Sequence, residues 1–546
     1  MSDGATHQVF NQSSDYAGFD SFATDPLLLA VARKLPAALA SDFSRHGRFA
    51  GSHEAQDLAR LANTETPKLR RFDEKGRRID QVDYHPAYHA LMRRSIAAGL
   101  AGSAWTGPDE EAGFRHASRA VRFYLAAGAE CGHLCPLTMT NASVAALGAE
   151  PGIGGAWTSL ITSRSYDLSP RWPLAKTGLT IGMGMTEKRG GTDVRANTTV
   201  AVADGEGGWR LDGHKWFLSA PMSDAFLMLA QTEAGPSCFL VPRRLQDGSL
   251  NGLHLQRLKD KLGNRSNASS EVELRDAAAR MVGEAGRGVR VIIDMVTMTR
   301  LDCAVASAGL MRSALGEAVH HCRERLVFGR PLVDHPQMTR VLADMALDVA
   351  AANALAMRLA RSFDEASTDP AAAAWMRVMT PATKYWVCKL APALAYEAME
   401  CLGGNGYVEE GRLARCYREA PVNAIWEGSG NVMALDLLRV LDRSPDAMEQ
   451  VLAGIAEDLG SHAEDLLQPL RTARATAADD PGAARLLTEQ LALAAAAGAL
   501  RRLGFEALSD AFAATRIRGS FCHSYGMLDA RFDARAIVDA LHPAIH

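Results

Sequence analysis

At the stretch MGMTEKRGGTDVRANTT, residues 183–199, the spacing of apolar residues along the sequence changes. Before it, apolar residues recur at spacings of three and four, which predicts helices. After it come short apolar or alternating runs separated by Gly, Pro and Asp, namely WRLDGHKWFLSA, AFLMLAQTE and SCFLVPRRL, and such runs are typical of strands. Within the stretch, Gly190 and Gly191 let the backbone approach a ligand closely, and Thr186 and Thr192 offer hydroxyls on either side of them.

The pattern on each side of this stretch predicts four regions in a chain of 546 residues. We expect an N-terminal helical domain over residues 1–180, a β-domain over 181–290, a helical bundle over 291–444 and a C-terminal helical domain over 445–546. The length exceeds one ordinary core and suits several domains. No βαβ alternation with a glycine fingerprint occurs, which excludes a Rossmann fold.

Composition and charge exclude several classes of protein. An apolar fraction of 47% and a charged fraction of 22% describe a soluble globular chain, and the net charge of −4 provides no field for nucleic acid or an anionic membrane. The N-terminus lacks the basic start and apolar core of a signal peptide, and no apolar run is long enough to span a bilayer. The nine cysteines are scattered and odd in number, as expected for free thiols in a reducing compartment. We therefore expect a cytoplasmic protein with no membrane partner.

One tight group of potential metal ligands occurs, at Cys131, His133 and Cys135. Such a site usually needs a second pair of ligands elsewhere, and the sequence offers none at a suitable spacing. We expect no metal ion.

A second stretch, AIWEGSGNVM at residues 424–433, places the carboxylate of Glu427 between an indole and a Gly-Ser-Gly run. The run predicts a turn. A carboxylate at the mouth of such a turn would be partly desolvated, and desolvation raises the pKa of a carboxyl group and strengthens it as a base. The alternative is a residue that starts a helix, because acidic groups favour N-terminal turns.

These two stretches, together with GHKWFLSA, RLVFGRPL (325–332) and CLGGNGYVEE (401–410), follow in this order along the chain. The set resembles the acyl-CoA dehydrogenase flavoprotein family over about residues 50–440. MTEKRGGTDV, GHKWF, RLKDKLGNRSNAS and IWEGSGN, with the long C-terminal extension, are similar to the AidB-type subgroup, which acts in the adaptive response to DNA alkylation. The resemblance implies a mainly α fold with an N-terminal helical domain, a middle β-barrel, a C-terminal four-helix bundle and an extra C-terminal helical domain.

The resemblance also implies a cofactor, FAD, and a set of site residues. Glu427 matches the family's catalytic base, which removes the α-proton of an acyl thioester. Within one subunit, the positions that match cofactor contacts are Met185, Thr186, Gly191, Thr192, Phe217, Ser219, Gly404, Trp426, Gly428 and Asn431. Arg325 and Phe328 match the segment that reaches FAD bound by a neighbouring subunit, which implies a homotetramer.

Substrate recognition departs from the family pattern. Arg300 matches an arginine near the catalytic base and is the expected contact to an acyl-CoA. Thr297, however, stands where an aspartate commonly binds the adenine moiety of CoA, and losing an acceptor for a buried donor costs about 1–3 kcal/mol. Pro336 and Glu400 stand where the family often has glutamines at the inter-subunit FAD contact. We therefore expect weak acyl-CoA dehydrogenase activity at most.

The C-terminal region gives a mixed signal for double-stranded DNA. From residue 451 onward it has nine Arg, no Lys and twelve acidic residues, a poor electrostatic footprint for DNA. Three arginines, Arg439, Arg516 and Arg518, are nevertheless the candidate phosphate contacts if they gather on one face.

Two functions stay open on the sequence alone. The first is an FAD-containing protein of the adaptive response to DNA alkylation damage that binds DNA and has weak dehydrogenase activity. The alternative is a metabolic acyl-CoA dehydrogenase for a branched or medium-chain acyl-CoA, whose C-terminal domain serves oligomerisation.

Overall fold

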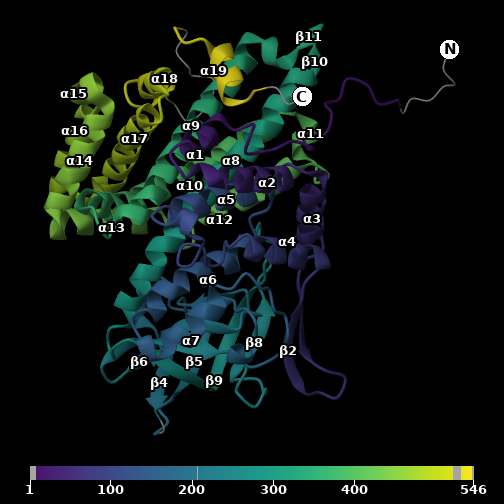
Figure 1. Cartoon of the computed structure of the whole chain (residues 1–546), viewed down its shortest axis with the longest axis vertical. Helices are drawn as coiled ribbons and strands as arrows, with labels where there is room; N and C mark the ends of the chain where they lie inside the picture. Colours follow the sequence, from purple (N-terminus) through teal and green to yellow (C-terminus); the bar gives the residue numbers. More distant parts are fainter. Residues whose placement is uncertain (1–7, 206, 520–530, 544–546) are drawn as a thin grey trace. The chain divides into compact units, whose positions relative to one another are not determined.

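The computed structural model describes residues 8–205, 207–519 and 531–543, and the chain forms two compact units (Figure 1). The barrel unit consists of residues 57–303 together with 425–432. The bundle unit consists of the rest of the chain. The short segment 425–432 therefore packs with a part of the chain that ends more than a hundred residues before it.

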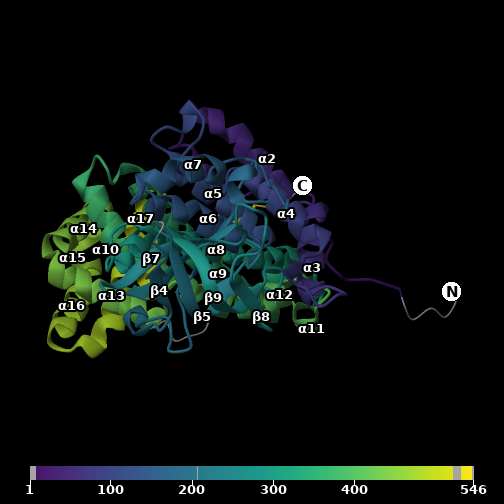
Figure 2. The ribbon, with the colours of Figure 1, turned by 90° about the horizontal axis from the view of Figure 1, so that it is seen from below.

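The barrel unit is built around a closed ring of strands. Its strands are β3 (Ile181–Gly184), β4 (Val200–Ala203), β5 (Trp209–Ser219), β6 (Ala225–Thr232), β7 (Gly235–Pro242), β8 (Leu253–Leu258) and β9 (Ser269–Val282). Antiparallel pairing runs from β4 through β5, β9 and β7 to β6, and a parallel pair of Val200 with Gln231 joins β4 to β6. Strand β3 adds parallel to β6 and β8 adds antiparallel to β9. Strands β4, β5 and β9 can be followed side by side in Figure 2.

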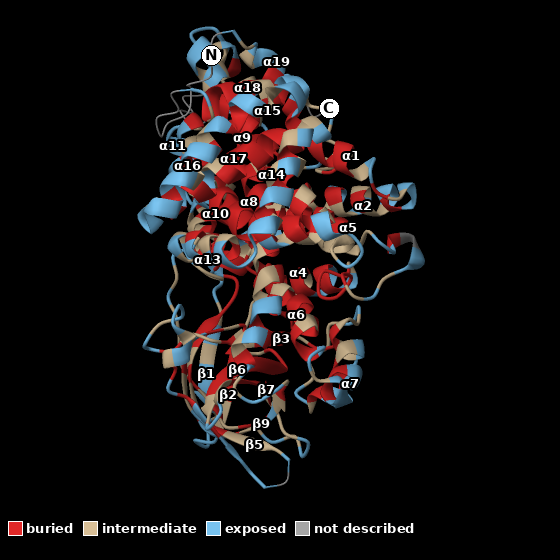
Figure 3. Cartoon of the chain, turned by 90° about the vertical axis from the view of Figure 1, so that its left-hand side faces the viewer, coloured by how far each residue is buried: buried red, intermediate tan, exposed pale blue. Residues whose placement is uncertain are grey.

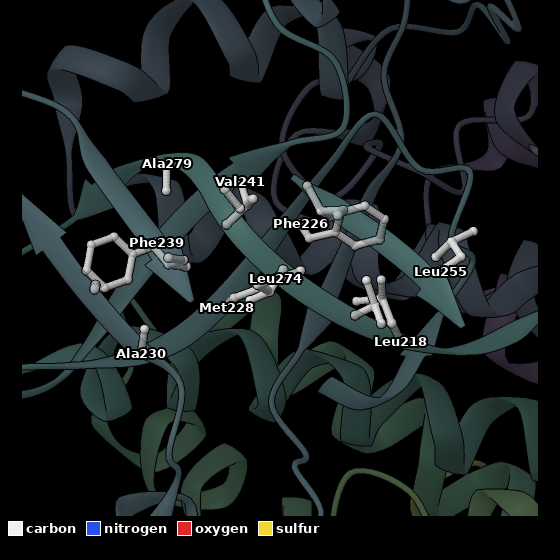
Figure 4. Close-up of a cluster of buried hydrophobic side chains, with 14 of the residues drawn as sticks. Leu218, Phe226, Met228, Ala230, Phe239, Val241, Leu255, Leu274 and Ala279 are labelled. Carbon is white, nitrogen blue, oxygen red and sulfur yellow. The ribbon is translucent and has the colours of Figure 1, made fainter. Parts of the chain in front are cut away.

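Apolar side chains from these strands form one core. In strand β5, Leu211 and Leu218 are buried and Phe217 is exposed, because a shift of register between Lys215 and Leu218 interrupts the alternation and brings Leu218 to the core face. Strand β6 is buried without interruption from Ala225 to Ala230, which explains its continuous apolar sequence. Figure 4 shows members of this cluster projecting from neighbouring strands.

The helices of the barrel unit lie before β3 in the chain, except for the last one, which follows β9. They are α3 (His53–Thr64, from residue 57), α4 (Pro86–Ala97), α5 (Arg115–Ala129), α6 (Leu134–Leu147), α7 (Pro151–Ile161) and the first part of α8 (Gly288–Glu324). A hairpin of β1 (Lys68–Phe72) and β2 (Arg78–Asp83) interrupts this helical region. The helical periodicity gave no sign of the hairpin, because its strands are short and rich in charged residues.

The bundle unit combines two N-terminal helices with the rest of α8 and long helices that follow it. Their bounds are α1 (Pro26–Ala32), α2 (Ala40–Ala50), α9 (Pro336–Glu365), α10 (Pro370–Cys401), α11 (Gly404–Tyr407), α12 (Arg412–Asn423) and α13 (Gly430–Arg443, from residue 433). A small hairpin, β10 (Leu326–Val327) with β11 (Arg330–Pro331), joins α8 to α9. Helix α10 packs on both α9 and α12.

The C-terminal part of the bundle unit is helical as well. It contains α14 (Pro445–Leu459), α15 (Ala463–Leu466), α16 (Gln468–Asp479), α17 (Ala484–Arg502), α18 (Glu506–Arg516) and α19 (Ala534–Leu541). Helix α17 packs against α9, α10 and α14, and α19 packs against α9. Figure 3 shows α9, α10 and α17 drawn mostly as buried. These C-terminal helices therefore cover apolar faces of the long helices.

The fold class predicted from the sequence is confirmed: helices dominate, a closed β-domain occupies the middle of the chain, and further helices follow the bundle. Among the described residues, no helix combines the length and the apolar character that a membrane crossing would require.

Candidate functional site

The loop after β3 presents a hydroxyl beside two glycines. The backbone N–H of Gly190 donates to the carbonyl of Glu187 at 2.9 Å, and Gly190 has a φ of +118°, a conformation that favours glycine. At Gly191 a Cβ would lie 2.6 Å from Oγ1 of Thr186, so only glycine lets the chain pass this hydroxyl. Gly191 and Thr192 are exposed. The loop thus offers bare backbone and hydroxyls to a ligand.

A buried ion pair anchors this loop to β5. Nζ of Lys215 lies 2.7 Å from Oε1 of Glu187, and both side chains are 0% exposed. Nζ of Lys215 also donates to the carbonyl of Leu229, while Glu187 accepts hydrogen bonds from Thr198 and Thr199. Burial raises the pKa of Glu187, but the charge of Lys215 and these hydrogen bonds outweigh burial and lower the pKa to about 2. Sequence reasoning missed this pair, although each motif contains one of its members.

The end of β5 presents aromatic rings and a hydroxyl. Nζ of Lys259 lies 3.7 Å from the ring centroid of Trp216 and 4.6 Å from that of Phe217, distances typical of cation–π contacts. The backbone N–H of Trp216 donates to the carbonyl of Thr186 at 2.8 Å. Ser219 ends the strand and is partly buried. The GHKWFLSA and MTEKRGG motifs are therefore joined through both backbone and side chains.

The buried thiol of Cys135 forms a hydrogen bond with Ser219 and is influenced by the charge of Glu427. Cys135 lies at the start of α6, is buried, and forms a hydrogen bond with Ser219. Burial raises the pKa of this thiol to about 12, and the negative charge of Glu427 adds to the rise. Ser219 and Glu427, although distant in sequence, thus both act on one buried thiol, Ser219 through a hydrogen bond and Glu427 through its charge.

Two consecutive residues of α8 hold Glu427 in an unusual conformation. Glu427 has a φ of +58°, a region that non-glycine side chains rarely adopt. Oγ1 of Thr299 donates to Oε2 of Glu427 at 2.8 Å, and Nε of Arg300 donates to the carbonyl oxygen of Glu427 at 3.0 Å. Side chain and backbone of the same residue are therefore fixed from one helix. Helix α13 begins only at Gly430, so Glu427 lies in the turn before it.

The geometry around Glu427 changes the expected role of Arg300 and adds Thr299 to the site. Arg300, predicted as a contact to substrate, uses its Nε on the backbone of Glu427. Thr299 was not predicted, and its place beside Arg300 in MTRLDCA was the available signal. Asp302, on the same helix, forms a buried bidentate pair with Arg119 of α5 at 2.7 and 2.8 Å. This pair anchors the segment of α8 that holds Glu427.

The described structure thus divides the predicted site residues between the two units. The barrel unit contains Met185, Thr186, Gly191, Thr192, Phe217, Ser219, Arg300, Trp426, Glu427, Gly428 and Asn431. The bundle unit contains Arg325, Phe328, Gly404, Arg439, Arg516 and Arg518.

In the bundle unit, Arg325 and Phe328 lie at the β10–β11 hairpin. Phe328 and Gly329 form its tip, and both have positive φ, +50° and +78°. The side chain of Phe328 is 94% exposed. Arg325 donates from Nη1 to the carbonyl oxygen of Asn11. Gly404 is exposed at the start of α11.

The three departures from the family pattern lie on helices. Oγ1 of Thr297 donates to the carbonyl of Ile293 one turn earlier, at 2.9 Å. Pro336 is the first residue of α9, a favoured position for proline, and Glu400 is exposed near the end of α10. Thr297 supplies no carboxylate at its position, and Pro336 and Glu400 supply no amide at theirs.

One predicted DNA contact is contradicted. The side chain of Arg516 is 3% exposed and forms ion pairs with Asp344 and Asp348 of α9. Burial lowers the pKa of the guanidinium, but the two carboxylates outweigh burial and raise the pKa. A guanidinium held inside the bundle unit by two carboxylates cannot also reach a phosphate. Arg439 and Arg518 are both exposed, and Arg518 is paired with Asp465.

In the Cys131, His133 and Cys135 group, the imidazole of His133 contacts protein side chains. Nδ1 of His133 lies 2.7 Å from Oε2 of Glu130, and Nε2 lies 2.9 Å from Oγ of Ser95, so both ring nitrogens are engaged. No group of three or more potential ligands with suitable placement occurs in residues 8–205, 207–519 and 531–543.

The barrel-unit residues fit a flavin dinucleotide. A Cβ at Gly191 would fill the space beside Thr186, which a ligand atom can use instead. Phe217 exposes an aromatic face, and Asn197 fixes the loop by donating from Nδ2 to the carbonyl of Met185 at 2.9 Å. Asn431 is exposed in the first turn of α13, where backbone N–H groups favour an anion.

Comparisons with known sequence families cover most of the chain. Residues 11–168 match the N-terminal domain of adaptive response protein AidB. Residues 182–277 match the middle domain of acyl-CoA dehydrogenases, and residues 286–441 match their C-terminal domain.

Individual proteins agree with these matches. The chain is 46% identical to AidB of Escherichia coli (strain K12) over 83% of its own length and 84% of AidB. It is 33% identical to acyl-CoA dehydrogenase family member 11 of Caenorhabditis elegans over 77% of its length and 70% of that protein. The crystal structure of Caenorhabditis elegans ACDH-11 in complex with C11-CoA superposes with a TM-score of 0.85, at 26% identity and 96% coverage of each chain.

Proposed function

Because the chain belongs to the acyl-CoA dehydrogenase family, we propose that it is an FAD-dependent oxidoreductase of the AidB type that acts on an acyl thioester. The observation that carries the proposal is the fixed position of Glu427, whose carboxylate and backbone are both held by α8. A turn held at a positive φ from two sides is the preorganisation that a catalytic base requires.

FAD is the cofactor. Thr186, Gly191 and Thr192 would line its ring and phosphates from the glycine loop, Phe217 and Ser219 from β5, and Trp426, Gly428 and Asn431 from the turn around Glu427. The ion pair of Lys215 with Glu187 keeps the loop and β5 in register. When bound, FAD supplies the oxidant, because its ring accepts the hydride that leaves Cβ of the substrate.

The residues of this chain remove the α-proton of the substrate. Glu427 takes the α-proton of the acyl thioester onto its carboxylate, and the Cα–H electron pair becomes part of the new Cα–Cβ double bond. Thr299 donates to Oε2 of the carboxylate, and Arg300 donates to the backbone carbonyl of Glu427 and keeps the turn in place. The general-base contribution is about 10²–10⁴ in rate.

An acyl-CoA is the substrate class, and activity is weak at low acyl-CoA concentrations. The likeness to ACDH-11, which is seen in complex with C11-CoA, supports an acyl-CoA ligand. The hydroxyl of Thr297 donates within its own helix and offers no carboxylate to an adenine amino group. Weaker anchoring of CoA lowers the occupancy of the reactive position rather than the strength of the base.

The test is an anaerobic titration of the purified holoprotein with saturated acyl-CoAs, including the C11 chain length. We expect flavin absorbance to fall with at least one of them, with one enoyl-CoA formed for each flavin bleached. If absorbance stays constant with every acyl-CoA while binding is detected by calorimetry, the dehydrogenase assignment is wrong.

A second activity, binding of double-stranded DNA in the adaptive response to alkylation, is supported by the likeness to AidB over most of the chain. Because Arg516 is buried, the proposed phosphate contacts are Arg439 and Arg518. Four of these proteins assembled into one tetramer would present the patch four times and gain effective concentration.

Charge reversal tests DNA binding more sharply than removal of the C-terminal region, because α14 and α17 cover apolar faces of α9 and α10. We expect Arg439→Glu and Arg518→Glu together to flatten the slope of log affinity against log salt by about two units, roughly 0.9 for each phosphate contact. An unchanged slope for duplex DNA would place the contact surface elsewhere.

The proposed assembly is a homotetramer in which the β10–β11 hairpin reaches FAD bound by a neighbouring subunit. An aromatic side chain exposed as fully as that of Phe328, at the tip of a tight turn, is suited to contact with a second chain. Arg325 supplies a cation for the cofactor phosphates.

A further inference from the structure

The N-terminal segment Phe10–Ser14 lies along the hairpin that carries Arg325 and Phe328. Nδ2 of Asn11 donates to the carbonyl oxygen of Leu326 at 2.9 Å, and Oδ1 of Asn11 accepts from the backbone N–H of the same residue at 2.8 Å. Arg325 donates to the backbone carbonyl of Asn11. One side chain and one carbonyl of the segment thus make three hydrogen bonds, two with Leu326 of β10 and one with Arg325 directly before it.

The residues after Asn11 attach the segment to neighbouring elements of the bundle unit. The backbone N–H of Ser14 donates to Oε2 of Glu324 at 2.6 Å, and Oγ of Ser14 donates to Oε1 at 3.0 Å. Oγ of Ser13 lies 3.1 Å from Nδ1 of His321. Oε1 of Gln12 accepts from Nδ2 of Asn405 on α11 at 2.9 Å. The purple chain that passes α11 in Figure 1 is this segment.

The backbone conformation of the segment allows these contacts. Asn11 has a φ of +50°, which asparagine tolerates better than most side chains. At that φ, its amide reaches both backbone groups of Leu326 while its own carbonyl faces Arg325. Phe10, which precedes Asn11, is 79% exposed.

We propose that Phe10–Ser14 is a strap that positions the β10–β11 hairpin, with Asn11 as the positioning residue, so that Phe328 and Arg325 are presented in one orientation to a second copy of this chain. The proposal rests on the proposed role of the hairpin at the neighbour's FAD. Two strands of two residues each cannot fix a hairpin alone, because such short pairings are marginal in water. The strap supplies the missing hydrogen bonds, and its anchoring at Glu324 and His321 ties the hairpin to the end of α8.

Asn11→Gly provides a clean test, since glycine keeps the positive φ and loses only the amide. Sedimentation and flavin fluorescence of the holoprotein are measured over a range of protein concentrations. We expect the concentration needed for half assembly, and with it for half retention of FAD, to rise by about tenfold, because two hydrogen bonds are lost. The thermal midpoint at high protein concentration should stay close to that of the unaltered protein.

A chain that begins at residue 15 should show the same change more strongly. Ser159→Ala, an exposed change on α7, should show none. Phe328→Ala distinguishes the proposed strap from the proposed role of the hairpin. If Phe328→Ala weakens assembly and FAD retention but Asn11→Gly and the shortened chain do not, the strap is wrong and the hairpin role stands. If Phe328→Ala also has no effect, the proposed hairpin role has failed.

Discussion

At the scale of single residues, the site depends on how one carboxylate is held. Oγ1 of Thr299 lies 2.8 Å from Oε2 of Glu427 and 3.0 Å from the carbonyl oxygen of Val296. The hydroxyl has one proton to donate. When Glu427 is ionised, donation to the carboxylate stabilises the charged form; when Glu427 is protonated, the hydroxyl can turn to Val296. Thr299 therefore favours the ionised, working form of the base.

Replacing Thr299 tests this account. We expect Thr299→Val to move the acid limb of the pH profile of flavin reduction to higher pH, because the ionised carboxylate loses a donor. Thr299→Ser should keep the profile of the unaltered protein, since serine retains the hydroxyl. The profiles are measured by stopped-flow bleaching with an acyl-CoA. Identical acid limbs for the valine and serine variants would show that the hydroxyl does not tune the base.

At the scale of elements, β5 and the glycine loop are joined by a fully buried ion pair. Lys215 and Glu187 are 0% exposed, and the additional hydrogen bonds of Glu187 to Thr198 and Thr199 satisfy its carboxylate. A buried pair with satisfied partners positions elements more than it stabilises them, because desolvation offsets much of the attraction.

Removing one member of this pair should therefore be costly and removing both should not. We expect Lys215→Met to lower the free energy of unfolding by about 3–5 kcal/mol, because it leaves the charge of Glu187 buried without its partner. Adding Glu187→Gln should recover much of the loss. Urea unfolding of both variants measures this. A single variant as stable as the unaltered protein would mean that water or another cation compensates the carboxylate.

The elements also show which parts of the fold and of the site could be predicted from the sequence. The alternating pattern of β5 and the apolar run of β6 predicted strands correctly, because each pattern is local. The burial of Arg516 could not be predicted, since its partners Asp344 and Asp348 lie about 170 residues earlier and nothing local marks the pairing. Thr299 and Asn11 were missed for the same reason: each acts on a residue more than a hundred positions away.

At the scale of the whole molecule, segments that are distant in sequence contact α8 within the bundle unit. Arg312 of α8 pairs with Asp25 before α1 and bonds to the ring of His542 after α19. Arg323 donates to the carbonyl of His542 and pairs with Asp539. Segments from the beginning and the end of the described chain therefore depend on the same helix.

The contacts of His542 with these two arginines predict that the stability of the protein depends on pH. Burial, with the charges of Arg312 and Arg323, lowers the pKa of His542 well below its ordinary value of 6.5. The folded protein therefore keeps this imidazole neutral while the unfolded chain takes up a proton, so stability falls as pH drops below about 6.5. We expect His542→Gln to lose less stability between pH 7.5 and 5.5 than the unaltered protein in urea unfolding. Equal losses would remove His542 as a contributor.

The most direct measurement of the central claim is the rate of flavin reduction in Glu427→Gln, whose side chain keeps the shape and cannot accept the proton. We predict a fall of about 10²–10⁴ relative to the unaltered protein, as general-base catalysis contributes, with FAD content unchanged because the cofactor contacts lie on other residues. Binding of the acyl-CoA, followed by calorimetry, should also stay within a few fold. Reduction at the rate of the unaltered protein would contradict the account, since Glu427 would then not be the base.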